Sequence, residues 1–449
     1  MFKRKVMSEL LDWKLHWSGR YAALLEGARR VGKTTVASSF AKENYDSFIK
    51  VDFSELTKSL RSIFEDIDDL DLFFLELQNY FQTKLYERRS VIIFDEIQLY
   101  PKARQAIKHL VADGRYDYIE TGSLISIKKN VEKILIPSEE FKIQVFPMDY
   151  EEFCWATGQN YDLLRETISL NRPLKNANRP LMRNFRIYMA VGGMPQAVEA
   201  YVEKKTFQEI DRIKREIIAL YKEDFAKIDP SGRVASIYSS IPSQLALKRS
   251  RFVLSKALHK KKTNKDELLL NELIGSKTVL PCFRVHEPRT PLSLTEDFDS
   301  YKLYLSDVGL FVTILFSSQK ETKENIYEKL LSDKLNANLG YLYENAVAQM
   351  LVSSGRDLYY FVWKDDGESR QSEIDFLIED SNKVIPIEVK SSETKNHSSI
   401  IKFSAKYSSY VSRRILLSQS DFGNDGMLEL KPIYAFPSVL ENLGKGKED

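Results

Sequence analysis

Residues 27–35, GARRVGKTT, constrain the fold of this chain more than any other stretch. They have the spacing G-x-x-x-x-G-K-[ST], in which two glycines let the backbone turn tightly so that its N–H groups can point at phosphate oxygens. The apolar run YAALLE precedes this segment and predicts a buried strand, and the run TTVASSFAKEN after it has a helical pattern. Because a helix N-terminus favours anions, the three segments together predict a phosphate-binding loop.

The side chains of this loop predict Mg-ATP as the ligand. Lys33 would place its charge against the β- and γ-phosphates, and Thr34 would offer its hydroxyl to Mg²⁺. Arg29 and Arg30 lie inside the loop, where contact with the nucleotide and a surface role are both open. A glycine-rich turn without a ligand is the alternative to the whole interpretation. The residues predicted to bind the nucleotide and its metal are Gly27, Arg30, Gly32, Lys33, Thr34, Thr35, Asp95 and Ser123.

A second motif, VIIFDE at residues 91–96, is an apolar run that ends in two acids. Such a strand end suits Mg-ATP hydrolysis, because Asp95 would hold the hydrated Mg²⁺ and Glu96 would polarise the attacking water. Alone, two acids usually mark a solvated strand end, but their place about 60 residues after the loop favours catalysis. The next strand candidate runs into Thr121-Gly122-Ser123, where a hydroxyl would orient the water or sense the γ-phosphate unless the segment is an ordinary turn.

Strand and helix patterns alternate from about residue 20 to about residue 150. This alternation predicts a mostly parallel sheet with its ligand at the C-terminal ends of the strands. A length of 449 residues allows two or three domains. The strand candidates are YAALLE, FIKVDF, VIIFDE, YDYIETGS and FKIQVF.

The composition, 43% hydrophobic and 29% charged, is typical of a soluble globular protein. A net charge of +2 predicts no global attraction to nucleic acid or membrane, so any such binding would need a local patch. The two cysteines, Cys154 and Cys282, lie far apart and have no metal-binding spacing, which fits a reducing compartment. The charged start and the lack of a long apolar run predict neither a signal peptide nor a membrane span, hence a cytoplasmic protein.

The middle of the chain predicts helices and then a small mixed module. Residues 150–225 have helical patterns, broken by VGGMP at 191–195. Two further helix patterns and the strand-like run KTVLPCFRVHE suggest a winged-helix module. Its basic stretch, residues 248–265, would contact DNA or RNA phosphates if it forms an outward patch. A solvated basic face or a protein contact is the favoured alternative. The basic residues are Lys248, Arg249, Arg251, Lys256, His259, Lys260, Lys261, Lys262 and Lys265.

The C-terminal part carries a second group of polar residues. SEIDFLI and VIPIEVK read as strands joined by a hairpin turn. If the turn centres between residues 381 and 382, Asp375 lies opposite Glu388 and Glu373 lies opposite Lys390, all on one face. Two opposed carboxylates beside a lysine form a site for a hard divalent cation and a water. A charge ladder on a solvated sheet face is the alternative, and the spacing does not decide between them.

The motifs together resemble a group of prokaryotic AAA-type P-loop ATPases whose C-terminal domain of unknown function is similar to the PD-(D/E)XK nuclease fold. The resemblance covers about residues 18–420 and rests on GARRVGKTT, VIIFDEIQLYP, YIETGS, FPMDYEEF, VGGMPQAV, LSDVGLF, GYLYENAVAQML and SEIDFLI…VIPIEVKSS. It implies that Glu344, Asp375 and Glu388 bind metal and that Lys390 helps to activate water.

The resulting expectation is an α/β multidomain protein. Its parts would be a P-loop AAA-like parallel sheet core at 1–150, a helical lid at 151–230, a winged-helix-like module at 231–315 and a restriction-endonuclease-like α/β domain at 335–435. The expected catalytic residues are Lys33, Glu96 and Lys390, and the expected cofactors are ATP and Mg²⁺.

Three functions stay open at this stage. The first is an ATPase that drives or licenses a nuclease on DNA or RNA. The second is a slow nucleotide switch whose C-terminal fold binds without cutting, and the third is an ATPase that remodels a protein partner. The intact set Asp375, Glu388 and Lys390 favours the first, and the near-neutral charge favours the others. An oligomer and an arginine finger are both left open.

Overall fold

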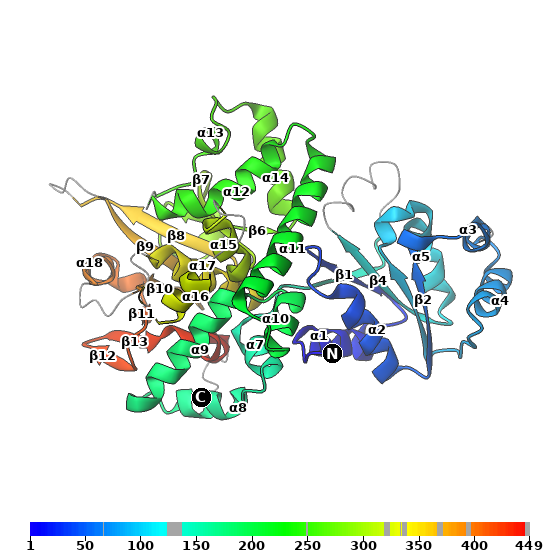
Figure 1. The fold of residues 1–449 in the computed structure, drawn as a ribbon, viewed down its shortest axis with the longest axis horizontal. Coiled ribbons are helices and arrows are strands. Elements are labelled where there is room, and N and C mark those ends of the chain that lie inside the picture. The colour runs from blue at the N-terminus through cyan, green and yellow to red at the C-terminus, as the bar shows by residue number, and fades with distance from the viewer. Residues whose placement is uncertain are drawn as a thin grey trace. The chain divides into compact units, whose positions relative to one another are not determined.

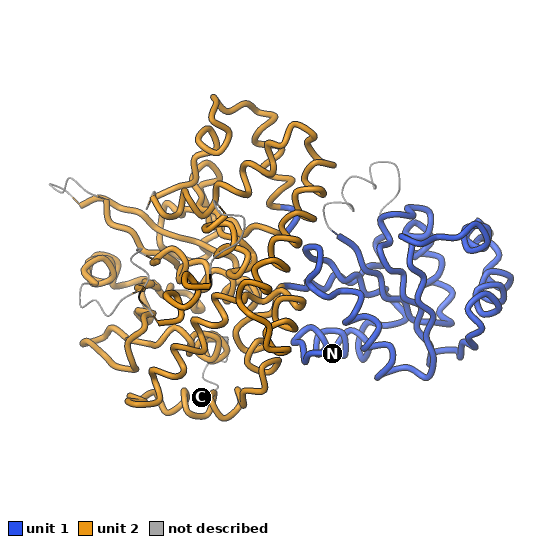
Figure 2. The backbone as a smooth tube through the Cα atoms, viewed as in Figure 1, with its two compact units in different colours: residues 1–146, 275–277 blue, residues 147–274, 278–449 orange. Residues whose placement is uncertain are grey.

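The computed structural model describes residues 1–65, 67–123, 137–247, 250–317, 324–332, 334, 339–365, 371–391 and 397–444. The chain divides into two compact units (Figure 2). Unit 1 comprises residues 1–146 and 275–277, and unit 2 comprises residues 147–274 and 278–449. Figure 1 labels many of the helices and strands of both units. Across the described ranges, every helix is too short or too polar to span a membrane.

Unit 1 is built on a parallel sheet, and its strands are the ones predicted from the sequence. The sheet order is β2-β3-β4-β1-β5, and each neighbouring pair is parallel. Strands β1, β3 and β4 are buried along their whole length, as expected for parallel strands covered on both faces. The strands are β1 (Ala22–Gly27), β2 (Ser47–Asp52), β3 (Ser90–Asp95), β4 (Asp117–Ser123) and β5 (Glu140–Gln144).

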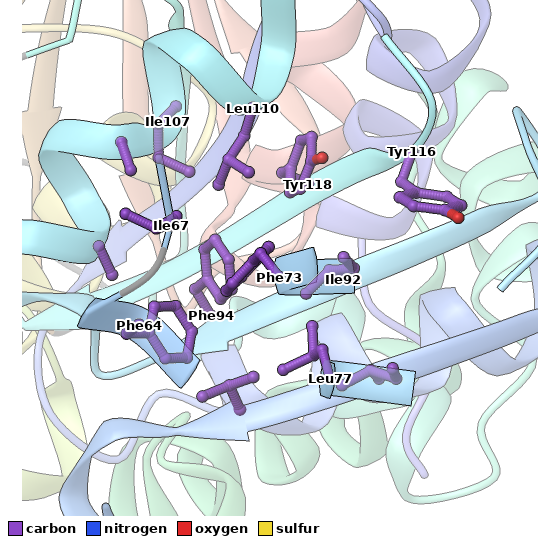
Figure 3. Packing of buried hydrophobic residues seen from close by; sticks show 14 of the residues in the cluster. Phe64, Ile67, Phe73, Leu77, Ile92, Phe94, Ile107, Leu110, Tyr116 and Tyr118 are labelled. Atoms are coloured by element: carbon purple, nitrogen blue, oxygen red, sulfur yellow. The ribbon is translucent and has the colours of Figure 1, made fainter. Parts of the chain in front are cut away.

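Helices cover both faces of this sheet. On one face, alternate strand residues such as Leu24, Phe94 and Tyr118 pack with residues of α3, α4 and α5 in an aromatic-rich core (Figure 3). The intervening residues Ala23 and Leu25 are buried as well, and α2 packs against β1 to β4. The helices are α1 (Val6–His16), α2 (Lys33–Asn44), α3 (Lys58–Glu65), α4 (Leu70–Phe81) and α5 (Pro101–Asp113), with short 3₁₀ turns η1 (Phe53–Glu55) and η2 (Ile97–Leu99).

Unit 2 begins with the predicted helical region. The helix break predicted at 191–195 is confirmed, since α9 ends at Val191 and α10 begins at Pro195. The helices before the first strand are α7 (Tyr150–Ala156), α8 (Tyr161–Ser169), α9 (Asn178–Val191), α10 (Pro195–Val202), α11 (Phe207–Ile228), α12 (Arg233–Ala246), α13 (Leu254–Ala257) and α14 (Asn264–Gly275). Those after it are α15 (Val308–Leu315), α16 (Glu324–Leu331), α17 (Gly340–Ser353), α18 (Ser398–Lys406) and α19 (Phe436–Gly444).

The break in the helical region is a point of close backbone packing. A Cβ on Gly193 would lie 1.9 Å from the carbonyl oxygen of Met148, and one on Gly192 would lie 2.8 Å from the Cα of Gly309. The Gly193 N–H donates to Asp307 Oδ2 at 2.6 Å. Three of the sequence motifs, FPMDYEEF, VGGMPQAV and LSDVGLF, therefore meet at one structural junction, where only glycine lets the backbones approach.

A mixed sheet forms the centre of unit 2. Its order is β12-β13-β11-β10-β9-β8-β6-β7. Strands β6 and β7, predicted to belong to the winged-helix-like module, share this sheet with the strands of the predicted nuclease-like domain, because β6 pairs in parallel with β8. The finer domain boundaries stay predictions. The strands are β6 (Val279–Val285), β7 (Glu296–Leu305), β8 (Leu358–Trp363), β9 (Ser372–Asp380), β10 (Lys383–Val389), β11 (Ile415–Ser418), β12 (Gly423–Asp425) and β13 (Leu428–Pro432).

The predicted register of the β9–β10 hairpin is confirmed. The paired residues run from Lys383 with Asp380 to Ile387 with Phe376, so the turn lies between residues 381 and 382. Ser381 adopts the left-handed backbone region that such a tight turn requires, with φ of 56°. The next positions along the two strands are Asp375 and Glu388. The hairpin thus brings the two predicted carboxylates to the same level.

Candidate functional site

The loop between β1 and α2 has the conformation that phosphate binding needs. A Cβ on Gly27 would lie 2.2 Å from the carbonyl oxygen of Val145, so this close approach requires glycine. Gly32 is left-handed at φ of 97° and caps α2, whose first residue is Lys33. Arg30 is also left-handed, with φ of 69°. The loop therefore turns sharply at the start of a helix, where N–H groups and the helix dipole favour an anion.

Lys33 is buried against this loop. Its Nζ donates to the carbonyl oxygens of Gly27 at 3.1 Å and Ala28 at 2.9 Å. These bonds hold the ammonium beside the loop rather than in solvent. Arg30 and Thr35 are exposed. They are the two predicted nucleotide contacts that lie most in solvent.

The sheet order brings Asp95 to the loop. Thr34 Oγ1 donates to Asp95 Oδ1 at 2.8 Å, and the Thr121 hydroxyl donates to the same oxygen. Lys50 Nζ lies 3.8 Å from Asp95 Oδ2. A hydroxyl and a carboxylate that touch at the start of a helix supply the hard oxygen ligands that Mg²⁺ prefers. The residues present therefore fit a Mg-nucleotide.

Glu96 follows Asp95 in a left-handed conformation, with φ of 55°. Its N–H donates to Thr121 Oγ1 at 3.2 Å, and its carboxylate accepts from the side-chain amide of Gln98. Glu96 is half-buried.

The second group of predicted residues also comes together, within unit 2. Val389 N–H donates to Asp375 Oδ2 at 2.8 Å, and Lys390 Nζ lies 2.5 Å from Glu388 Oε1. Glu344, on α17, accepts from the Tyr304 hydroxyl at 3.2 Å. We call Glu344, Glu373, Asp375 and Glu388 the carboxylate cluster. Its acids come from one helix and two neighbouring strands.

Burial dominates the electrostatics of this cluster. It raises the pKa of Glu344 to about 7, and the charge of Asp375 adds to the rise. Burial likewise raises the pKa of Glu373 and of Glu388. Burial alone would lower the pKa of Lys390, but the carboxylates of Glu388 and Asp375 outweigh it and raise that pKa. The charge of Asp375 also raises the pKa of Glu373 and of Glu388, so burial and a neighbouring charge both favour the protonated acids.

In the part of the chain that the structure describes, no group of three or more His, Cys, Asp or Glu side chains is arranged to hold a metal ion. Asp375 and Glu388 are instead engaged by a backbone N–H and by Lys390. The metal-binding roles of Glu344, Asp375 and Glu388, and the catalytic role of Lys390, stay predictions.

Comparison with known families assigns the first unit. Residues 19–154 match the family model described as an AAA domain. The chain carries an AAA-type P-loop ATPase domain. Residues 182–321 and 339–433 match two models described as domains of unknown function, DUF8612 and DUF4143. Among curated proteins, none gives a significant match to this sequence.

Solved structures give only weak overall matches. A Thermotoga maritima RuvB Holliday junction branch migration motor is 14% identical, with a TM-score of 0.29, and the match covers 65% of this chain and 91% of that one. Cdc6p from Pyrobaculum aerophilum is 12% identical, with a TM-score of 0.24 and coverage of 74% and 94%. C. elegans PCH-2 is 16% identical, with a TM-score of 0.20 and coverage of 34% and 44%. At TM-scores this low, none of the three supports an inference about function.

Within the AAA domain, the structure adds residues that sequence reasoning missed. The sequence places a hydroxyl within Thr121-Gly122-Ser123 and names Ser123 as the nucleotide contact, and Ser123 ends β4 beside Gly27 in the register. The hydroxyl that contacts Asp95 belongs to Thr121. Thr121 and Ser123 lie on one face of β4. Because Phe94 pairs with Glu120 in the parallel register, the next residues, Asp95 and Thr121, are level with each other. Lys50 and Gln98 carried no sequence signal, since each reaches the site from a different segment.

The basic stretch is partly neutralised by the helix that follows it. Lys260 Nζ lies 3.5 Å from Asp266 Oδ1, and Lys262 Nζ lies 2.8 Å from Glu267 Oε1. Lys248 and Arg249 lie outside the described residues. These ion pairs reduce the charge available to nucleic acid phosphates.

Proposed function

We propose that this chain binds and hydrolyses Mg-ATP in its AAA domain, and that this cycle is coupled to a nuclease-like C-terminal site that acts on or binds nucleic acid. The observation that carries the first part is the contact of both Thr34 and Thr121 with one oxygen of Asp95. It gathers two hydroxyls and a carboxylate at the end of the phosphate loop, groups that could bind Mg²⁺.

The residues of the AAA domain would divide the work. Lys33 and the loop N–H groups would bind the phosphoryl oxygens, and Glu96 would orient the attacking water. Thr34 and Asp95 would hold Mg²⁺, which when bound supplies positive charge to the phosphates. Thr121 would fix the direction of the Asp95 carboxylate and of the Glu96 backbone. The side-chain amide of Gln98 donates to the Glu96 carboxylate. This hydrogen bond would break when Glu96 orients the attacking water.

The confirmed hairpin register supports the second part of the proposal. The register puts Asp375 and Glu388 at the same level of the hairpin, and Lys390 pairs with Glu388, which is the arrangement on which the nuclease-like proposal rests. A slow nucleotide switch or a protein-remodelling ATPase is the second candidate. It is favoured by the Gln98 contact with Glu96 and by the ion pairs of Lys260 and Lys262.

Two assays test the proposal. Glu96→Gln keeps the side-chain shape and removes the charged acceptor, so we expect it to retain ATP while phosphate release nearly stops. Unchanged turnover would mean that Glu96 is not the catalytic carboxylate. Mg²⁺- or Mn²⁺-dependent cleavage of DNA and RNA, with and without ATP, tests the C-terminal site, with Asp375→Ala as the inactive control. Lack of cleavage of any substrate would favour the switch.

A further inference from the structure

Arg4 is a buried cation that none of the sequence motifs includes. It precedes α1, and only 5% of the residue is exposed. Its Nη1 donates to the carbonyl oxygen of Val31 at 3.0 Å, and its Nη2 donates to that of Phe146 at 2.7 Å. Val31 belongs to the phosphate loop, and Phe146 follows β5. One guanidinium, whose planar fork of donors suits such a bridge, therefore joins three segments that are far apart in the sequence.

The bond to Val31 fixes the direction of the next N–H along the loop. Because the peptide unit is planar and trans, the carbonyl of Val31 and the N–H of Gly32 point in opposite directions. Gly32 is the left-handed residue that caps α2, with φ of 97°, and Val31 is fully buried. Arg4 therefore holds the direction of one N–H group at the helix N-terminus, where an anion would bind.

The phosphate loop also packs against the residues that follow β5. The Val145 N–H donates to the carbonyl oxygen of Glu26 at 2.7 Å. The Val145 carbonyl oxygen lies where only a glycine at position 27 lets the loop approach it. This segment therefore contacts the start of the loop directly and its end through Arg4. Phe146 is the last residue of unit 1 before the chain enters unit 2, so the shape of the loop and the path of the chain out of unit 1 are fixed together.

We propose that Arg4 is a positioning residue for nucleotide binding, which ties Val31 to Phe146 and thereby keeps the phosphate loop in the conformation that accepts phosphate. The inference rests on the proposed function in one respect, that the ligand of the loop is a nucleotide. Its physical basis is the freedom of the loop, since a turn that contains glycine has several accessible conformations. Because only the competent conformation binds, the apparent dissociation constant rises as the fraction of that conformation falls. Arg4 contacts backbone oxygens, so it acts on the nucleotide through the loop.

Arg4→Met removes both donors and keeps an unbranched side chain, and measurements on the full-length chain test its effect. Hydrogen–deuterium exchange of the peptide that covers residues 27–35 should become faster in the nucleotide-free protein. The affinity for a fluorescent ATP analogue should fall by about 10-fold. In steady-state hydrolysis, kcat should change less than KM, because Asp95 and Glu96 keep their contacts.

Two further variants complete the test. Lys3→Met removes the exposed positive charge next to Arg4 in the sequence and should match the wild type in exchange and in affinity. Arg4→Lys keeps a charged donor without the fork, so it should lie between the wild type and Arg4→Met. Melting curves identify a variant that fails to fold, and if Arg4→Met is one, Arg4→Lys takes its place in the test.

The outcomes separate this inference from the proposed function. Faster exchange and weaker analogue binding in the Arg4 variant, without change in Lys3→Met, support the inference. Unchanged exchange or unchanged affinity in the folded variant overturns it, as does an equal loss in Lys3→Met or a fall in kcat with KM unchanged. Lys33→Ala tests the proposed function separately, because it removes the predicted phosphate contact and leaves Arg4 in place. If the wild type binds no nucleotide, the proposed function falls, and the exchange rate alone decides whether Arg4 fixes the loop.

Discussion

At the scale of single residues, the AAA domain depends on one carboxylate oxygen shared by two hydroxyls. Asp95 Oδ1 accepts from both Thr34 and Thr121, and Thr121 in turn accepts from the Glu96 N–H. Thr121 is fully buried, so its hydroxyl is aligned by the sheet rather than by solvent. This side chain thus couples Asp95, the acid predicted to bind metal, to the backbone of Glu96, the acid predicted to be catalytic.

Thr121→Val should slow ATP hydrolysis by about 10- to 150-fold, because it removes a hydrogen bond to a charged group with little change of shape. ATP binding should change less, since Lys33 and the loop remain. Steady-state phosphate release and titration with a fluorescent ATP analogue measure the two effects. Ser123→Ala is the matched control on the same face of β4 and should have the smaller effect. The reverse order would return the role to Ser123.

Glu344→Gln should change how stability depends on pH in the metal-free protein. The pKa of Glu344 is about 7 when folded, against an ordinary value of 4.5. Between these values the folded state keeps a proton that the unfolded state loses, so the free energy of unfolding of the wild type falls as pH rises. The variant lacks this loss and should become relatively more stable across that window. Melting temperatures at several pH values check this, and a constant difference would contradict it.

At the scale of elements, one residue of α17 bonds to the end of β7, the strand that pairs with β6 in the unit 2 sheet. Asn345 satisfies both backbone groups of Leu305, and Gln349, one turn further along α17, accepts from the Val308 N–H at 2.9 Å. The side-chain amides of Asn345 and Gln349 thus bond to the backbone of Leu305 and Val308, at and just beyond the end of β7. The helix that supplies Glu344 therefore also bonds to the strand that carries Lys302, a buried partner of the carboxylate cluster.

Asn345→Ala should lower the free energy of unfolding by roughly 2–4 kcal/mol, because two buried backbone groups lose their partners. Chemical denaturation monitored by circular dichroism measures the change. Ser353→Ala, on the same helix and only half-buried, is the control and should cost much less. Equal effects of the two changes would mean that the Asn345 clamp contributes little.

At the scale of the whole molecule, the C-terminal acids cannot be separated from the strands that precede them. A fragment that starts at about residue 335 would lack β6 and β7 and would uncover the edge of β8. It would also lack Lys302 and Tyr304. The full chain is therefore the form in which metal binding should be measured.

Replacement of Lys260, Lys261 and Lys262 by Glu tests whether the basic stretch binds nucleic acid. If it does, binding should weaken, and the slope of log K against log salt should flatten by about 0.9 for each duplex DNA phosphate that the variant no longer neutralises. Gel-shift titrations at several salt concentrations measure this slope. Identical slopes for the variant and the wild type would mean that the stretch is a solvated face or a protein contact.

The sequence by itself determined the phosphate loop, the Asp95-Glu96 pair, the five strands of the AAA domain and the β9–β10 register. These features are local, because glycine spacing, apolar runs and a tight turn act over a few neighbouring residues. Only the tertiary structure decided that Thr121 contacts Asp95, that Lys302 enters the carboxylate cluster and that β6 and β7 join the C-terminal sheet. Those contacts join segments far apart in the chain. Their partners follow from strand order and register, which alternation of side chains along one strand does not specify.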